Sequence, residues 1–107
     1  MIEPPVPATL DQEQALLQPL AARLIWWQSP QQSLRRPDRV IAQAMEFGDF
    51  DSVLRLRQVL GDRRLAMVLQ CAQPGWFSPR SWTYWHLKLG LAPSGAVPPL
   101  PQRRFGP

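Results

Sequence analysis

The sequence predicts an all-α fold, a small bundle of four to five short helices with extended, proline-rich N- and C-terminal tails. Apolar residues recur three and four positions apart, which is the period of one helix face, and no stretch of useful length alternates apolar and polar residues. Gly48, Gly61 and Gly90 follow these stripes where helices are expected to end. The 13 prolines crowd both ends, and proline removes a backbone donor and disfavours helical conformation in the residue before it.

The length of 107 residues fits one domain with a single core. We expect an extended N-terminus at residues 1–8, a helical domain at residues 9–91 and a proline-rich, partner-binding tail at residues 92–107. The glycine stops separate dissimilar helices, so the chain contains no internal repeat.

A first helix is expected to begin after Thr9, because Thr9 and Gln12 have the spacing of a capping box. Pro19 should bend or divide this helix, since an interior proline loses a hydrogen bond and clashes with the preceding turn. The apolar run in "RLIWWQSP", residues 23–30, fits either a brief strand or the end of a bent helix. The expected apolar residues of the helix are Leu10, Leu16, Leu17 and Leu20.

A second helix should begin at Pro37, where Asp38 complements the helix dipole, and end at Gly48. Either Asp49 or Asp51 then caps the next helix, which ends at Gly61. The residues expected to face inward are Val40, Ile41, Ala44 and Met45 on the second helix and Phe50, Val53, Leu56 and Leu60 on the next.

Asp62 is the expected cap of another helix, which "QPG" at residues 73–75 breaks. Its inward residues are Leu65, Val68, Leu69 and Ala72, and the lone Cys71 is interpreted as a small buried hydrophobe. A last helix begins with Ser78 as cap and Pro79 as first residue, and it ends by Gly90.

The stretch "PGWFSPRSWTYWHLKLG", residues 74–90, holds half of the aromatic side chains of the sequence. One helical stripe of Trp82, Trp85, His86 and Leu89 is typical of core, whereas Tyr84, Leu87 and Leu91 point the other way. Packing every ring inside so small a body would strain it, and Trp, Tyr and Arg are frequent anchors of interfaces. The predicted partner contacts in this stretch are Trp76, Phe77, Arg80 and Tyr84, although Trp76 and Phe77 could instead staple the start of the helix.

Catalytic chemistry is not expected. His86 and Cys71 could form a base and a nucleophile, but His86 lies on the helical stripe and fits a hydrogen-bonded, partly buried imidazole. The acidic residues recur where helix caps belong, and neither a glycine-rich phosphate loop nor metal-ligand spacing is found in the sequence. A single cysteine excludes an internal disulfide and any zinc site built from several cysteines. We therefore expect a non-enzyme with no catalytic residue, cofactor or metal.

Twelve Lys and Arg against eight Asp and Glu give a net charge of +4, and all of the basic residues except Lys88 are arginine. Arginine pairs with carboxylate or phosphate through two hydrogen bonds, so the bias fits an acidic partner or nucleic acid, or else a preference for arginine codons. No run of 18 apolar residues predicts a membrane span, and the N-terminus lacks the pattern of a secretory signal. A cytoplasmic location is expected.

The tail "PPLPQRRF", residues 98–105, favours polyproline II geometry, whose backbone is free to bind a partner. Its spacing of two prolines and an arginine, P-x-x-P-x-R, matches proline-rich ligands, although a solvated disordered end explains it as well. The predicted partner contacts are Pro98, Leu100, Pro101, Arg103, Arg104 and Phe105.

The segments "RVIAQAMEFGDFDSVLRLRQVLGD" and "PGWFSPRSWTYWHLKLGL" resemble a family of small bacterial proteins. The shared pattern is a helix ending in a glycine–acid pair, a second helix, and a serine-capped helix with a tryptophan and a final Leu-Gly, and it covers roughly residues 24–91. Members are typically encoded beside nucleotidyltransferase toxins of the AbiEii abortive-infection type. The resemblance implies an antitoxin that binds and neutralises such a toxin; the first, leucine-rich helix departs from the pattern.

The preferred hypothesis is therefore a toxin–antitoxin system in which the helical body docks on the toxin and the tail lies near its nucleotide cleft. The alternative is a DNA-binding regulator, because residues 65–90 also read as helix, turn, helix. Few side chains in this segment could hydrogen-bond to DNA bases. Arg80 lies near the start of its last helix and Lys88 near the end, with tryptophans between them. Both activities could coexist in one antitoxin that represses its own operon.

Overall fold

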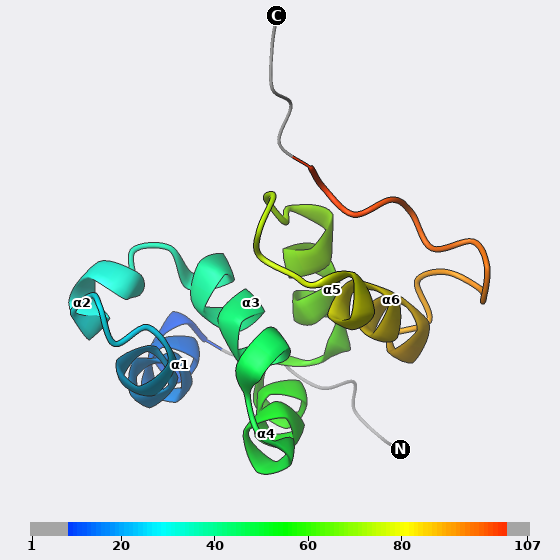
Figure 1. Cartoon of the computed structure of the whole chain (residues 1–107). Coiled ribbons are helices and arrows are strands. Elements are labelled where there is room, and N and C mark those ends of the chain that lie inside the picture. The colour runs from blue at the N-terminus through cyan, green and yellow to red at the C-terminus, as the bar shows by residue number, and fades with distance from the viewer. Residues whose placement is uncertain (1–8, 103–107) are drawn as a thin grey trace, which may run out of the picture.

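The computed structural model describes residues 9–102, and this part of the chain is all-helical, with no strand (Figure 1). The predicted fold class is confirmed. Within these residues six helices follow one another, one more than the largest number expected: α1 (Leu10–Leu24), α2 (Pro30–Ser33), α3 (Pro37–Phe47), α4 (Phe50–Leu60), α5 (Asp62–Gln70) and α6 (Pro79–Lys88).

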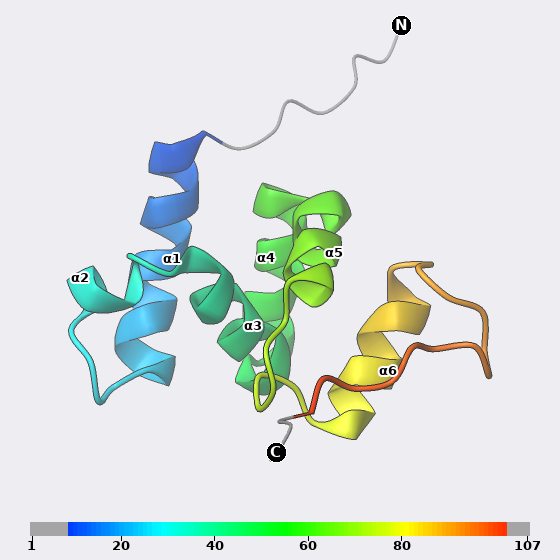
Figure 2. The same cartoon turned by 90° about the horizontal axis from the view of Figure 1, so that it is seen from above.

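Helix α3 lies at the centre of the bundle and contacts α1, α2, α4 and α5 (Figures 1 and 2). Six consecutive residues, Val40 to Met45, are buried, so α3 is covered around its whole circumference. The one polar member of this run, Gln43, donates from Nε2 to the Leu24 carbonyl at 3.4 Å. This bond satisfies part of the buried amide and ties the end of α1 to α3.

Helix α1 begins with the predicted capping box between Thr9 and Gln12. Pro19 lies inside the helix without dividing it. Both Pro19 and Ala15 are exposed, so water can satisfy the Ala15 carbonyl that loses its helical donor. The undecided segment after Arg23 is the end of this helix followed by a turn, and the short α2 then starts with a capping box of its own, formed by Ser29 and Gln32.

The connections between α3, α4 and α5 are very short. Gly48 caps α3, and a Cβ at this position would lie 2.5 Å from the Ala44 carbonyl oxygen, so the chain needs glycine there. Asp49, and not Asp51, caps α4 through the Ser52 amide at 2.8 Å. Gly61 joins α4 to α5 at a φ of 84°, a conformation that favours glycine.

Three local predictions in this region are wrong. Asp62 is the first residue of α5 and makes no cap; it forms an ion pair with Arg57 instead. Phe50 is exposed, because it lies at the start of α4, ahead of the buried Leu56 and Leu60. Cys71 is also exposed, because α5 ends at Gln70 and the thiol falls in the following turn.

Helix α6 closes the bundle against α5, and its predicted inward stripe is confirmed for Trp82, Trp85 and His86. Trp85 donates from Nε1 to the Met45 carbonyl at 3.1 Å, which fastens α6 to the central helix. The buried His86 ring is satisfied through Nδ1, which lies 2.7 Å from the Trp82 carbonyl oxygen.

The first part of the C-terminal tail runs back along α6 (Figure 2). The Trp82 indole donates from Nε1 to the Pro98 carbonyl at 2.8 Å. Val97 and Leu100 pack against the hydrophobic core. This segment of the tail therefore belongs to the folded body, which extends past the expected boundary at residue 91.

Candidate interaction surfaces

Trp76 and Phe77, two of the predicted partner contacts, are buried in the chain's own core. The Phe77 ring centre lies 5.9 Å from that of Trp82, and Trp76 lies beneath the guanidinium of Arg39 at 5.6 Å. Both residues therefore pack inside the chain, as the alternative interpretation expected. They are not accessible to a partner.

Arg80 and Tyr84 are exposed on the outer side of α6. The Tyr84 ring leans edge-on against Trp85, with ring centres 5.3 Å apart. Leu87 and Leu91 are exposed as well, so the second apolar face predicted for α6 is not covered by residues 9–102. These side chains are accessible to a partner.

The predicted tail contacts divide into two groups. Pro98 is exposed with its carbonyl held by Trp82, while Leu100 and Pro101 are partly buried. The packing of Leu100 on its own core accounts for an apolar residue that a solvated tail would not need. Arg103, Arg104 and Phe105 lie outside the described residues.

A different set of aromatic side chains is the most exposed in the described part of the chain, and the predicted contacts did not include it. Trp26 is 77% exposed, Trp27 55%, Phe47 63% and Phe50 79%. We call these four residues the aromatic end. Two adjacent tryptophans are a signal that could have identified it, because tryptophan is a frequent anchor of interfaces.

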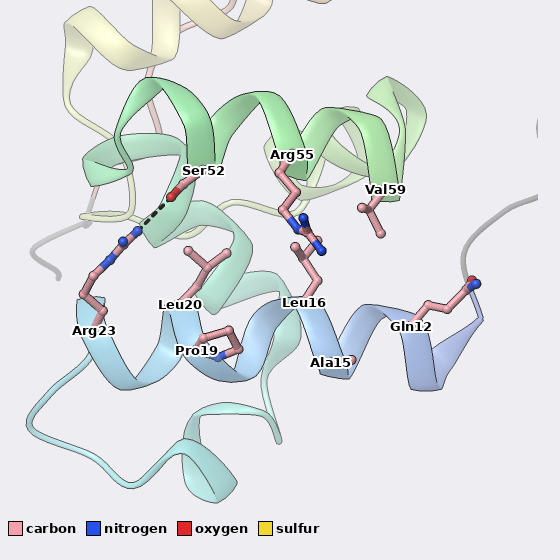
Figure 3. Close-up of a pocket in the computed structure, with 9 residues that line it drawn as sticks. All are labelled: Gln12, Ala15, Leu16, Pro19, Leu20, Arg23, Ser52, Arg55 and Val59. Carbon is pink, nitrogen blue, oxygen red and sulfur yellow. Dashed lines mark hydrogen bonds between the residues drawn. The ribbon is translucent and has the colours of Figure 1, made fainter.

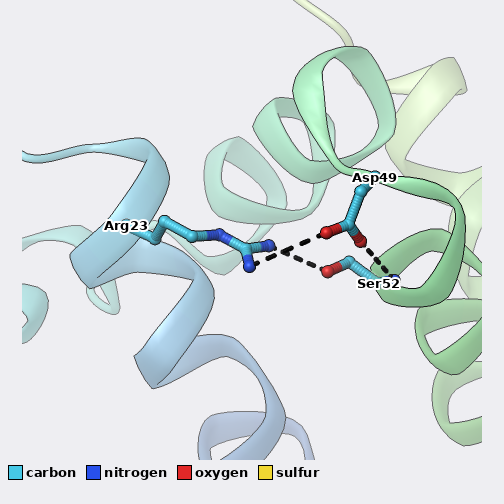
Figure 4. A network of polar contacts seen from close by, with 3 residues as sticks. All are labelled: Arg23, Asp49 and Ser52. Carbon is cyan, nitrogen blue, oxygen red and sulfur yellow. Dashed lines mark hydrogen bonds and ion pairs between the residues drawn. The ribbon is translucent and has the colours of Figure 1, made fainter.

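Arg23, three residues before Trp26, links the segment that leads into the two tryptophans with the start of α4, where Phe50 lies. Arg23 donates from Nη2 to the Ser52 hydroxyl at 2.8 Å, and its Nη1 lies 4.0 Å from the Asp49 carboxylate (Figure 4). These contacts join the last turn of α1 to the first turn of α4. Hydrogen bonds from the backbone and then the side chain of Ser52 lower the pKa of Asp49, which favours the charged form that faces Arg23.

An open groove of about 760 Å³ runs between α1 and α4 beside this junction (Figure 3). Its surface is mainly aliphatic, and Arg23 and Arg55 supply its charges. Arg55 forms no ion pair within residues 9–102. The groove residues are Gln12, Ala15, Leu16, Pro19, Leu20, Arg23, Ser52, Arg55 and Val59. Such a surface suits an apolar segment with an acidic side chain.

Within residues 9–102, no three His, Cys, Asp or Glu side chains gather in a way that could hold a metal ion. The same part of the chain has no helix with the length and apolar content needed to cross a membrane. None of the protein-family models, curated proteins or solved structures compared with this chain matches it.

Proposed function

We propose that this protein is an antitoxin that binds and neutralises a nucleotidyltransferase toxin encoded beside it, as its resemblance to the AbiEii-associated bacterial family implies. It would act as a protein-binding inhibitor in the cytoplasm, with no small-molecule substrate. The pattern that carries the resemblance contains Gly48–Asp49 and the serine-capped α6. These features position helices, so the binding groups must be sought on the surface.

The aromatic end is the observation that supports this proposal most strongly. A large aromatic side chain buries about 150–250 Å². At the exposures given above, the four residues offer roughly 400–700 Å² of apolar surface, against about 800 Å² that one partner buries in a standard interface. Exposed tryptophan and phenylalanine side chains are frequent anchors of interfaces.

Inhibition is proposed to be steric. The aromatic end and the adjacent groove dock on the toxin, and the C-terminal tail lies across or near its nucleotide cleft. There Arg103 and Arg104 would meet the acidic, metal-binding carboxylates of the toxin. The bond between Trp82 and Pro98 fixes the origin of that tail on α6.

The test is to purify the nucleotidyltransferase encoded by the adjacent gene and measure nucleotide transfer at increasing concentrations of this protein. We expect inhibition and a stable complex. The variant Trp26→Ala/Trp27→Ala should weaken binding at least about tenfold, because a central interface tryptophan typically contributes about 2 kcal/mol or more. Leu10→Ala is the matched control, an exposed apolar residue at the other end of α1. Full enzyme activity at saturating protein would reject the proposal.

The alternative, a DNA-binding regulator, has less geometric support. The connection between α5 and α6 covers residues 71–78, whereas helix-turn-helix motifs use a turn of about 3–4 residues. The buried Trp82, Trp85 and His86 leave Arg80 and Lys88 as the exposed basic residues of α6. Titration of the chain's own promoter fragment at several salt concentrations tests it, since tight and steeply salt-dependent binding would favour this alternative.

A further inference from the structure

Arg39, in the first turns of α3, carries the one buried side-chain polar atom of residues 9–102 that has no hydrogen-bond partner, Nη1. Its guanidinium carbon lies 5.6 Å from the centre of the Trp76 ring, which is itself buried. The ring provides a cation–π contact but accepts no in-plane hydrogen bond from the guanidinium. Nη1 itself is closed off from solvent, but the guanidinium as a whole is only partly buried, so a partner can reach Arg39 through its other donors.

The surroundings of Arg39 are basic. Arg35 and Arg36 precede it in the chain and are exposed, and no ion pair within residues 9–102 involves any of the three arginines. Burial and then the charge of Arg36 lower the pKa of Arg39. A partly buried charge beside a like charge is destabilising unless an anion compensates it.

Arg64 on α5 shows how the same chain satisfies a comparable guanidinium. Its Nε lies 2.7 Å from the Glu13 carboxylate and its Nη2 lies 2.7 Å from the Asp38 carboxylate. Burial alone would lower the pKa of Arg64, but the hydrogen bonds with Asp38 and Glu13 outweigh it and raise that pKa. Arg39 is also partly buried, yet no carboxylate of residues 9–102 pairs with it.

We propose that Arg39 is a carboxylate-binding site, which takes an Asp or Glu side chain from an acidic segment of the protein partner. Arg39 forms the hydrogen-bonded pair, and the exposed Arg36 adds long-range attraction. The site rests on the proposed function, because it names a contact within that complex. A protein carboxylate fits better than duplex DNA, since DNA is gripped by several exposed cations along successive phosphates and Arg39 is recessed against Trp76.

The experiment measures the affinity for the nucleotidyltransferase encoded by the adjacent gene, by calorimetry, for the wild-type chain, Arg39→Met, Arg39→Lys and Arg63→Met. Arg63 is the control, an exposed arginine of α5 without an ion pair in the described chain. Arg39→Met should weaken binding about tenfold or more, since truncating one partner of a desolvated charge pair is costly. Arg39→Lys should fall in between, because lysine keeps the charge but loses the fork, and the control should stay within about twofold.

A second measurement, the thermal unfolding midpoint of the free protein, separates binding from a structural role. Arg39→Met should leave that midpoint unchanged or raise it, because the substitution removes an uncompensated charge. A lowered midpoint together with unchanged affinity would assign Arg39 to stability and overturn the site. If Arg39→Met does not fold, the affinity of Arg39→Lys is compared with that of the wild-type chain instead.

The outcomes distinguish this site from the proposed function. If the wild-type chain binds and inhibits the enzyme and Arg39→Met does so equally well, the site is overturned while the antitoxin function stands. If the wild-type chain neither binds nor inhibits, the proposed function fails and the site fails with it. If Arg39→Met loses binding to promoter DNA but still binds the enzyme, the ligand of Arg39 is a DNA phosphate and not a protein carboxylate. That result would overturn the proposal.

Discussion

The substitution Arg64→Met removes a junction that joins three helices. Arg64 belongs to α5, and its two carboxylate partners, Glu13 and Asp38, belong to α1 and α3. Methionine keeps most of the aliphatic stem, so the main change is the loss of charge and hydrogen bonds. Two acidic side chains would remain near each other without their shared cation.

The size of the effect follows from how far these groups are removed from water. The side chains of Arg64, Glu13 and Asp38 are 22%, 14% and 36% exposed. Breaking a fully buried pair costs about 3–5 kcal/mol, and an exposed pair contributes about 0–1 kcal/mol. We therefore expect Arg64→Met to lower the free energy of unfolding by about 2 kcal/mol, a large share of the ~5–15 kcal/mol typical of a domain.

Urea unfolding followed by tryptophan fluorescence measures this effect. With a slope of about 1–2 kcal/mol per molar urea for a small domain, the midpoint should fall by about 1–2 M. Arg63→Met controls for the change in net charge and should shift the midpoint little. Adding Glu13→Gln to Arg64→Met should cost less than the sum of the two single substitutions, because the pair is already broken. A midpoint that moves no further than in Arg63→Met would refute the assignment of this junction as stabilising.

Two further predictions concern the contact between Trp82 and the tail, and the dependence of stability on pH through the ion pair of Arg57 and Asp62. Trp82→Phe keeps an aromatic ring but removes the donor to Pro98, so the backbones of Val97, Leu100 and Gln102 should become more mobile in NMR relaxation, with a cost of about 1 kcal/mol to stability. Trp85→Phe, which breaks a bond inside the core, should leave the mobility of these residues unchanged. The hydrogen bond from Arg57 lowers the pKa of Asp62, so its stabilisation is present above the ordinary aspartate pKa of about 3.9 and is lost as the pH falls through the lowered value. The melting temperature of Asp62→Asn should accordingly lie below that of the wild type at pH 7, and the gap should close as the pH falls through the lowered pKa of Asp62. A gap independent of pH would contradict this assignment.

The helix boundaries were predictable because their signals are local. The capping box at Thr9, the Pro37 start, the Gly61 stop and the Ser78 cap each depend on residues within one turn. The inward stripe of α6 was predictable for a similar reason, since period and side-chain size fix which face is buried.

The remaining features depend on contacts between distant segments. Asp62 has the sequence position of a cap, but Arg57 takes its carboxylate. Trp76 and Phe77 precede α6 in a turn, where periodicity carries no information about burial, and the rest of the core covers them. The missing partner of Arg39 could not be inferred either, because only the folded chain shows that Glu13 and Asp38 are both committed to another arginine.

The placement of the five tryptophans follows from what each indole can reach. Trp85 and Trp82 donate to the carbonyls of Met45 and Pro98, and Trp76 supports the guanidinium of Arg39, so all three can be buried. Trp26 and Trp27 contact each other edge-on, with ring centres 5.7 Å apart, and both remain exposed. Within residues 9–102, the exposed aromatic side chains are thus those of the aromatic end and Tyr84 on the outer face of α6, and a partner that uses the ring surface of this part of the chain must bind at one of these two places.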